Sequence, residues 1–166
     1  MGWLGRLFGG PKRQTGRAEM DSALKRLVVP ALREAGFKGA MPHLRRLSGG
    51  HYDLLSFQFS KWGGAFAVEA ARCRRDGVET PLGHVPGDRA KAWDMPRRHR
   101  VGAGRAGGDH WFKFEHDDPD AVAQRLLAEL GKPALWEIAE TLPLDWPEGE
   151  AEAGARAGDA DDADGG

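Results

Sequence analysis

The feature that most constrains the fold is an alternating stretch in the middle of the chain, residues 51–73, which reads HYDLLSFQFSKWGGAFAVEAARC. Residues 53–60 alternate apolar side chains such as Phe57 with serine and glutamine, the period of two expected of a strand with one buried face. Residues 65–73 alternate in the same way, and the two glycines between the runs suit a tight turn with positive φ. The stretch therefore predicts a β-hairpin. An isolated hairpin is marginal in water, so the remaining chain must supply further strands and a covering helix.

Helical spacing of apolar residues predicts a helix over residues 18–35, ahead of the hairpin. Pro30 lies inside this helix and removes one backbone hydrogen bond, which predicts a kink near Lys25. Gly36 follows as a residue suited to end the helix in a left-handed conformation. We expect this helix to pack across the apolar face of the hairpin. The pairing would bury Phe57, Phe59, Phe66 and Val68 of the hairpin against Leu24, Leu27 and Leu32 of the helix.

Two further helices are expected near the C-terminus. Asp118 is placed to cap the first of them and Pro119 to occupy its first position, with Gly131 at its end. The second runs from Pro133 to Leu142 and is halted by another proline.

Three weaker strand signals lie at residues 43–48, 97–102 and 110–115, with a turn expected at 39–42. Residues 74–96 contain three prolines and three glycines without a sustained period, and we interpret them as a long loop. These elements predict an α+β fold, an antiparallel meander of about 4–5 strands packed on one side by an N-terminal helix and C-terminal helices.

The length of 166 residues fits one domain with additional terminal segments. We expect a flexible N-terminal segment at residues 1–17, a single α+β domain at 18–147 and a disordered acidic tail at 148–166, because alanine, glycine and acids bury too little apolar surface to offset chain entropy.

No apolar run reaches the roughly 18 residues of a membrane span, so we expect no transmembrane segment. A single cysteine, Cys73, cannot form an internal disulfide, and we expect a cytoplasmic protein.

The N-terminal segment contains a short apolar motif followed by basic residues. Its members are Trp3, Leu4, Leu7 and Phe8. A motif this short forms no stable helix by itself, so we expect it to dock on a protein partner, on a membrane surface or on its own domain.

Charge is unevenly divided along the chain. Residues 1–116 carry 21 Lys and Arg against 11 Asp and Glu, whereas residues 117–166 carry 3 against 14. Such a division is consistent with a basic face for polyanions, with an acidic tail that shields this face, or with two solvated surfaces that favour solubility.

Catalytic templates find little support in the sequence. His110 and His116 lie near acidic residues, but their spacing matches no known zinc motif. Cys73 is flanked by arginines that favour a thiolate, yet no feature places a base beside it. We therefore expect no catalytic residue, no metal and no cofactor, and an uncharacterised hydrolase-type enzyme stays as an alternative.

Arginine and tryptophan residues are the candidate binding residues. Tryptophan and arginine dominate the energetics of protein interfaces, and together they also bind single-stranded nucleic acids by stacking and charge. The candidates are Trp62, Arg72, Arg74, Trp93, Arg97, Arg98, Arg100 and Trp111. We favour a non-catalytic protein-binding or accessory module with an unknown protein partner, with nucleic-acid binding through an arginine-rich face as the alternative.

The order of these motifs resembles a known family. A helix ends in GFK at residues 36–38, the hairpin contains FQFSKWGGAFAV, and RVG at 100–102 and DHWF at 109–112 precede two helices. Over residues 18–143 the chain resembles the bacterial domain-of-unknown-function family 4304. It departs from the family pattern at Phe112, where a second tryptophan is common, and at Pro133–Trp136, which reads PALW. The resemblance implies the α+β fold and assigns no activity.

Overall fold

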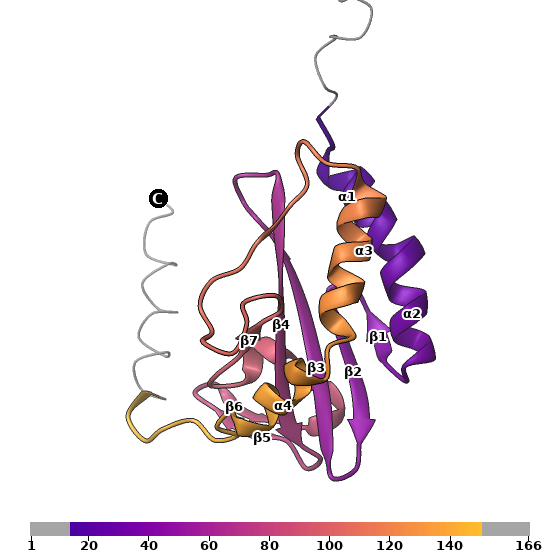
Figure 1. The fold of residues 1–166 in the computed structure, drawn as a ribbon. Coiled ribbons are helices and arrows are strands. Elements are labelled where there is room, and N and C mark those ends of the chain that lie inside the picture. The colour runs from indigo at the N-terminus through magenta and orange to yellow at the C-terminus, as the bar shows by residue number, and fades with distance from the viewer. Residues whose placement is uncertain (1–13, 151–166) are drawn as a thin grey trace, which may run out of the picture.

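The computed structural model describes residues 14–150, in which a six-stranded antiparallel sheet is covered by helices on one face (Figure 1). The strands are β1 (Lys38–Ala40), β2 (His43–Ser48), β3 (His51–Phe59), β4 (Ala65–Arg74), β7 (His99–Arg100) and β8 (Phe112–Lys113). Their order is β1-β2-β3-β4-β7, and β8 also pairs with β4. The α+β fold and the antiparallel meander predicted from the sequence are confirmed.

The predicted hairpin is the centre of the sheet. The β3–β4 pairing runs from His51 opposite Arg74 to Phe59 opposite Phe66. Phe57 and its partner Val68 are buried as expected. Phe59 is only partly buried, because β2 pairs with β3 no further than Ser56 and leaves the end of β3 less covered.

The N-terminal helix forms as predicted but changes its winding near Pro30. It consists of α1 (Arg17–Ala23), a π-helical turn (Leu24–Val28) and α2 (Val29–Glu34). Pro30 lacks the N–H that a regular α-helix donates to the carbonyl four residues earlier, and the π turn lies where the sequence predicts a kink. Gly36 has a φ of 93° and ends the helix.

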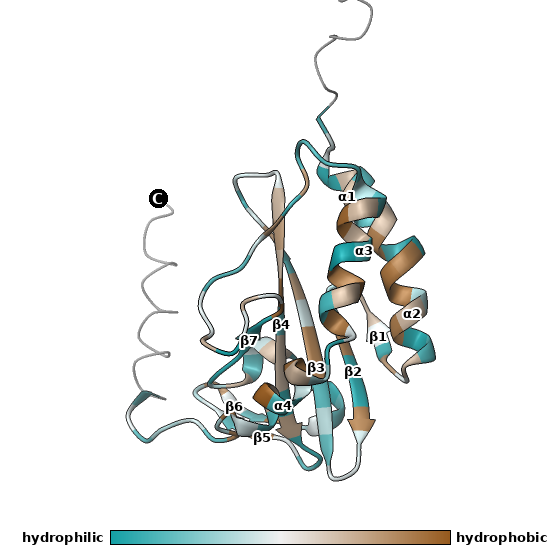
Figure 2. Cartoon of the chain, viewed as in Figure 1, coloured by the Kyte–Doolittle hydropathy of each residue, from teal (hydrophilic) through white to brown (hydrophobic). Residues whose placement is uncertain are grey.

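The C-terminal helices are α3 (Pro119–Leu130) and α4 (Pro133–Thr141). Asp118 caps α3 as predicted, its Oδ2 accepting a hydrogen bond of 3.0 Å from the N–H of Ala121. The helix α3 packs against α1 and the π turn, whereas α4 lies on β4 and β7. Figure 2 shows hydrophobic residues on α1, α2 and α3 and along β4, where these elements form the main core.

The opposite face of the sheet is covered by the segment that the sequence presents as a long loop. This segment contains β5 (Val78–Thr80), β6 (Gly83–Val85) and two 3₁₀ turns, η3 (Gly87–Arg89) and η4 (Ala92–Asp94). It forms a second core by packing on Leu54, Ala71 and Cys73 through Val78, Ala90, Ala92 and Met95. Leu54, which interrupts the alternation of β3, is apolar because it lies in this second core. The turn expected at 39–42 also differs, since β1 occupies its beginning.

Two expectations lie outside the described residues: the apolar motif at residues 3–8 and most of the acidic tail. Within residues 14–150, no helix is long and apolar enough to cross a membrane.

Candidate functional site

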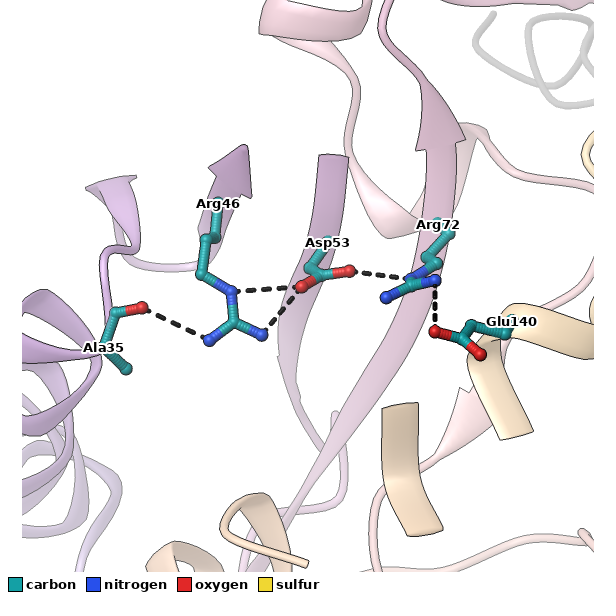
Figure 3. Close-up of polar contacts among 5 residues, drawn as sticks. All are labelled: Ala35, Arg46, Asp53, Arg72 and Glu140. Carbon is teal, nitrogen blue, oxygen red and sulfur yellow. Dashed lines mark hydrogen bonds and ion pairs between the residues drawn. The ribbon is translucent and has the colours of Figure 1, made fainter. Parts of the chain in front are cut away.

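Arg72 lies in a row of ion pairs that crosses three strands (Figure 3). The register places Arg46 of β2 and Arg72 of β4 on either side of Asp53 of β3. Asp53 is fully buried and accepts bonds of 3.0 and 2.7 Å from Arg46 on one oxygen and of 2.8 Å from Arg72 Nε on the other. Two arginines thus neutralise Asp53 through three charge-assisted hydrogen bonds.

Both ends of this row continue into helices. Arg72 Nη1 donates to Glu140 of α4 at 2.8 Å, and Arg46 Nη1 donates at 3.2 Å to the carbonyl of Ala35, just after α2. The guanidinium of Arg46 also lies 4.6 Å from the ring centre of Phe37. The row therefore connects the sheet to α4 at one end and to the end of α2 at the other. The charge of Arg72 is balanced by carboxylates within the domain.

Arg74 and Arg97 are paired with the segment after α4. Arg74 binds Asp145 through two bonds of 2.5 and 2.8 Å. Arg97 contacts Glu150 at 3.2 and 3.3 Å. The acidic C-terminal part of the described chain therefore neutralises arginines of the expected basic face.

Arg98, Arg100 and Trp111 are brought together around Glu69, which the sequence did not single out. Glu69 of β4 is buried and lies 2.9 Å from Arg98 Nε and 3.5 Å from Arg100 Nε. The guanidinium of Arg100 lies 5.0 Å from the ring centre of Trp111, whose Nε1 donates to Asp109 at 2.9 Å. In the sequence, an acidic residue within the apolar run of β4 indicates a buried ion pair. The arginines that pair with it could not be identified, because they belong to a distant segment.

Trp93 packs edge-on against His43, with ring centres 4.6 Å apart. His43 Nδ1 is 2.8 Å from Ser56 Oγ, and burial lowers the pKa of this histidine. Trp93 is thus partly covered and supports a polar pair on the sheet.

Trp62 is the most exposed of the candidate residues. It lies in the β3–β4 turn with 86 % of its surface exposed, and its only ring partner among residues 14–150 is Lys61, at 5.0 Å. Gly63 and Gly64 have φ values of 80° and 72°, which allow the tight turn. Beside the turn is an open hollow of about 520 Å³ lined by Gly64, Glu115 and His116, among others. We define the hairpin-tip surface as Lys61, Trp62, Gly63, Gly64, Glu115 and His116.

Cys73 is a residue of the second core, and its burial determines the protonation of its thiol. Burial in the second core raises its pKa to about 11, so it is a neutral thiol at physiological pH. Within the described part of the chain, no three His, Cys, Asp or Glu residues are grouped so that they could hold a metal ion.

Comparison with known proteins supports the family resemblance. No curated protein and no solved structure matches the chain. The family model described as "Domain of unknown function (DUF4304)" matches residues 28–140, which is more than half of the sequence. The matched span contains Trp62 and all four side chains of the ionic row. The chain therefore belongs to the DUF4304 family, a family of domains of unknown function.

Proposed function

We propose that this domain is a non-catalytic protein-binding module whose contact surface is the hairpin-tip surface. The observation that carries the proposal is the 86 % exposure of Trp62 at the end of the central hairpin. The indole contributes little to either core, although burying a tryptophan removes about 150–250 Å² from water. Tryptophan is among the residues that most often anchor protein interfaces.

The first residues of the described chain lie beside the hairpin-tip surface, which supports the proposal. The N–H of Thr15 donates to the carbonyl of Glu115 at 2.9 Å, and its Oγ1 donates to the carbonyl of Asp117 at 2.8 Å. Glu115 in turn donates its N–H to the carbonyl of Gly64 at 3.3 Å. The chain therefore enters the described domain beside the hairpin tip, and the apolar motif Trp3, Leu4, Leu7 and Phe8 precedes Thr15 in the sequence. We infer that the motif and Trp62 contact one partner together.

The charges favour a protein over a polyanion as the partner. Each arginine of the candidate set pairs with a carboxylate: Arg72 with Asp53 and Glu140, Arg74 with Asp145, Arg97 with Glu150, Arg98 with Glu69, and Arg100 with Glu69 and Asp109. The hairpin-tip surface combines the positive charge of Lys61 with the negative charge of Glu115, unlike a phosphate-binding groove, which gathers cations.

A pull-down from native lysate with matched variants tests this proposal. Trp62→Ala removes the anchor, and Leu82→Ala is the control, because Leu82 is 90 % exposed in the turn of the β5–β6 hairpin. We expect a defined protein that the wild type and Leu82→Ala retain, that Trp62→Ala loses, and that nuclease treatment leaves in place. Equal retention by Trp62→Ala contradicts the proposal, and loss of the bound material on nuclease treatment favours nucleic acid instead.

A further inference from the structure

We propose that a second site, at the N-terminus of α4, binds a small monocarboxylate. The site is a cavity of about 160 Å³ between α4 and the loop that follows β7. Its polar lining includes His99, Arg105, Glu129 and Lys132, and its apolar wall includes Leu135 and Ile138. This α4 cavity is separate from the hairpin-tip surface, and the inference does not depend on the function proposed above.

His99 provides an unused hydrogen-bonding group in this cavity. It pairs with Ala70 in the sheet, so its side chain lies on the face that α4 covers. Only 6 % of His99 is exposed, and its ring makes no hydrogen bond to another group among residues 14–150. Burial lowers the pKa of His99, which leaves a neutral imidazole with one N–H to donate. His99 lines the cavity, and an oxyanion bound there would accept this N–H.

The first turn of α4 provides a further donor. Its N-cap residue, Lys132, makes no side-chain capping bond, and Pro133 has no N–H. Ala134 therefore carries the first N–H of the helix, and no carbonyl among the described residues accepts it. The positive end of the helix dipole and the free N–H of Ala134 favour a bound anion at this position, whereas the N–H of Leu135 already donates to the carbonyl of Lys132 at 3.1 Å.

The charges around the cavity favour a monoanion. Arg105 and Lys132 contribute two positive charges and Glu129 one negative charge to the lining, and Glu137 beside Arg105 balances the remaining positive charge, so the site has no excess of cations for a dianion. Lys132 pairs with Glu129 at 2.7 Å and Arg105 with Glu137 at 2.8 Å. These pairs are largely exposed and therefore weak, so an incoming carboxylate can share both cations.

The volume and the apolar wall of the α4 cavity restrict which anions it can bind. The volume of about 160 Å³ is below the roughly 300–1,000 Å³ of pockets that hold drug-sized molecules, which favours a small ligand. Leu135 and Ile138 would contact a short hydrocarbon chain, which inorganic phosphate lacks.

An NMR titration of the full chain at constant ionic strength tests this inference. Sodium propionate, sodium phosphate and sodium chloride are the probes, and the readouts are the amides of Ala134 and Leu135 and the ring signals of His99. We expect saturable shifts at these positions with propionate, weaker ones with phosphate and none with chloride. Absence of saturable shifts with propionate overturns the proposal, and tighter binding of phosphate overturns the assignment to a carboxylate.

Two matched lysine variants show whether binding depends on the site. Lys132→Gln is paired with Lys25→Gln, because each lysine is about equally exposed (58 % and 59 %) and lies 2.7 Å from a carboxylate on its helix or beside it. We expect Lys132→Gln to weaken propionate binding several-fold and Lys25→Gln to leave it unchanged. An equal loss in both variants would show a general charge effect and overturn the proposal.

Discussion

Asp53 is a carboxylate with no exposed surface, and two arginines on neighbouring strands compensate its charge. Asp53→Asn leaves Arg46 and Arg72 without their shared counter-charge, and removing one partner of a buried ion pair typically lowers the free energy of unfolding by about 3–5 kcal/mol. The exposed end of the same row behaves differently. Glu140→Gln breaks a pair in which Glu140 itself is 57 % exposed, and such a pair is worth at most about 1 kcal/mol. Urea denaturation of both variants measures the difference, and equal small losses would show that the row contributes little to stability.

The thiol of Cys73 gives a second prediction at the residue scale. Its pKa of about 11 exceeds the ordinary value of 9.0, so the folded protein holds a proton that the unfolded chain releases between these two values. Because the unfolded state then binds fewer protons, stability falls as the pH rises above about 9. We expect the wild type to lose more stability than Cys73→Ala between neutral and alkaline pH, as measured by urea denaturation. Equal losses in the two proteins would mean that the thiol titrates normally in the fold.

At the scale of elements, the covered second face of the sheet is the feature to test. Leu54→Ala creates a cavity between β3 and the segment of residues 75–96, and we expect a loss of about 2–5 kcal/mol in the free energy of unfolding. Leu47→Ala is the control, because Leu47 is 48 % exposed on the same face of the neighbouring strand and should lose far less. Similar losses measured by denaturation in the two variants would indicate that the segment packs loosely on the sheet.

The elements that the sequence predicted well are those specified by local signals. The cap at Asp118 and the left-handed glycine at Gly36 act within one helical turn, and the alternation around Phe57 continues from Leu55 to Phe59. The strands β5 and β6 have three residues each, which is too short for a period to be recognised. Their burial depends on contacts with Leu54 that are distant in sequence.

The candidate site residues also differ in whether the local sequence or contacts between distant segments determine their positions. Trp62 could be placed in the turn because its neighbours Gly63 and Gly64 specify that turn locally, whereas the exposure of its side chain is known only from the fold. The pairing of Arg98 with Glu69 and the position of His99 beside α4 depend on how distant segments meet across the sheet. No local pattern encodes those meetings, so the arginine face appeared free in the sequence and is paired in the structure.

At the scale of the whole molecule, the basic part of the sequence and the acidic part contact each other in the fold. Glu140, Asp145 and Glu150 belong to the acidic part and pair with Arg72, Arg74 and Arg97 of the basic part. Such pairs hold acidic groups over the arginines and reduce the field that a polyanion would encounter.

The last prediction concerns this shielding. Truncation after Pro147 removes seven acids and one base, which changes the formal net charge from −1 to +5 and removes the partner of Arg97. We expect the truncated protein to elute later than the full chain from a heparin column at low salt. Asp145→Asn in the truncated chain should add to the delay by freeing Arg74. The pairs are exposed and are screened over roughly 8–10 Å at physiological salt, so the difference should disappear at high ionic strength. Identical elution of the full and truncated chains at low salt would mean that residues 148–166 do not shield the arginines and act as a solubility extension.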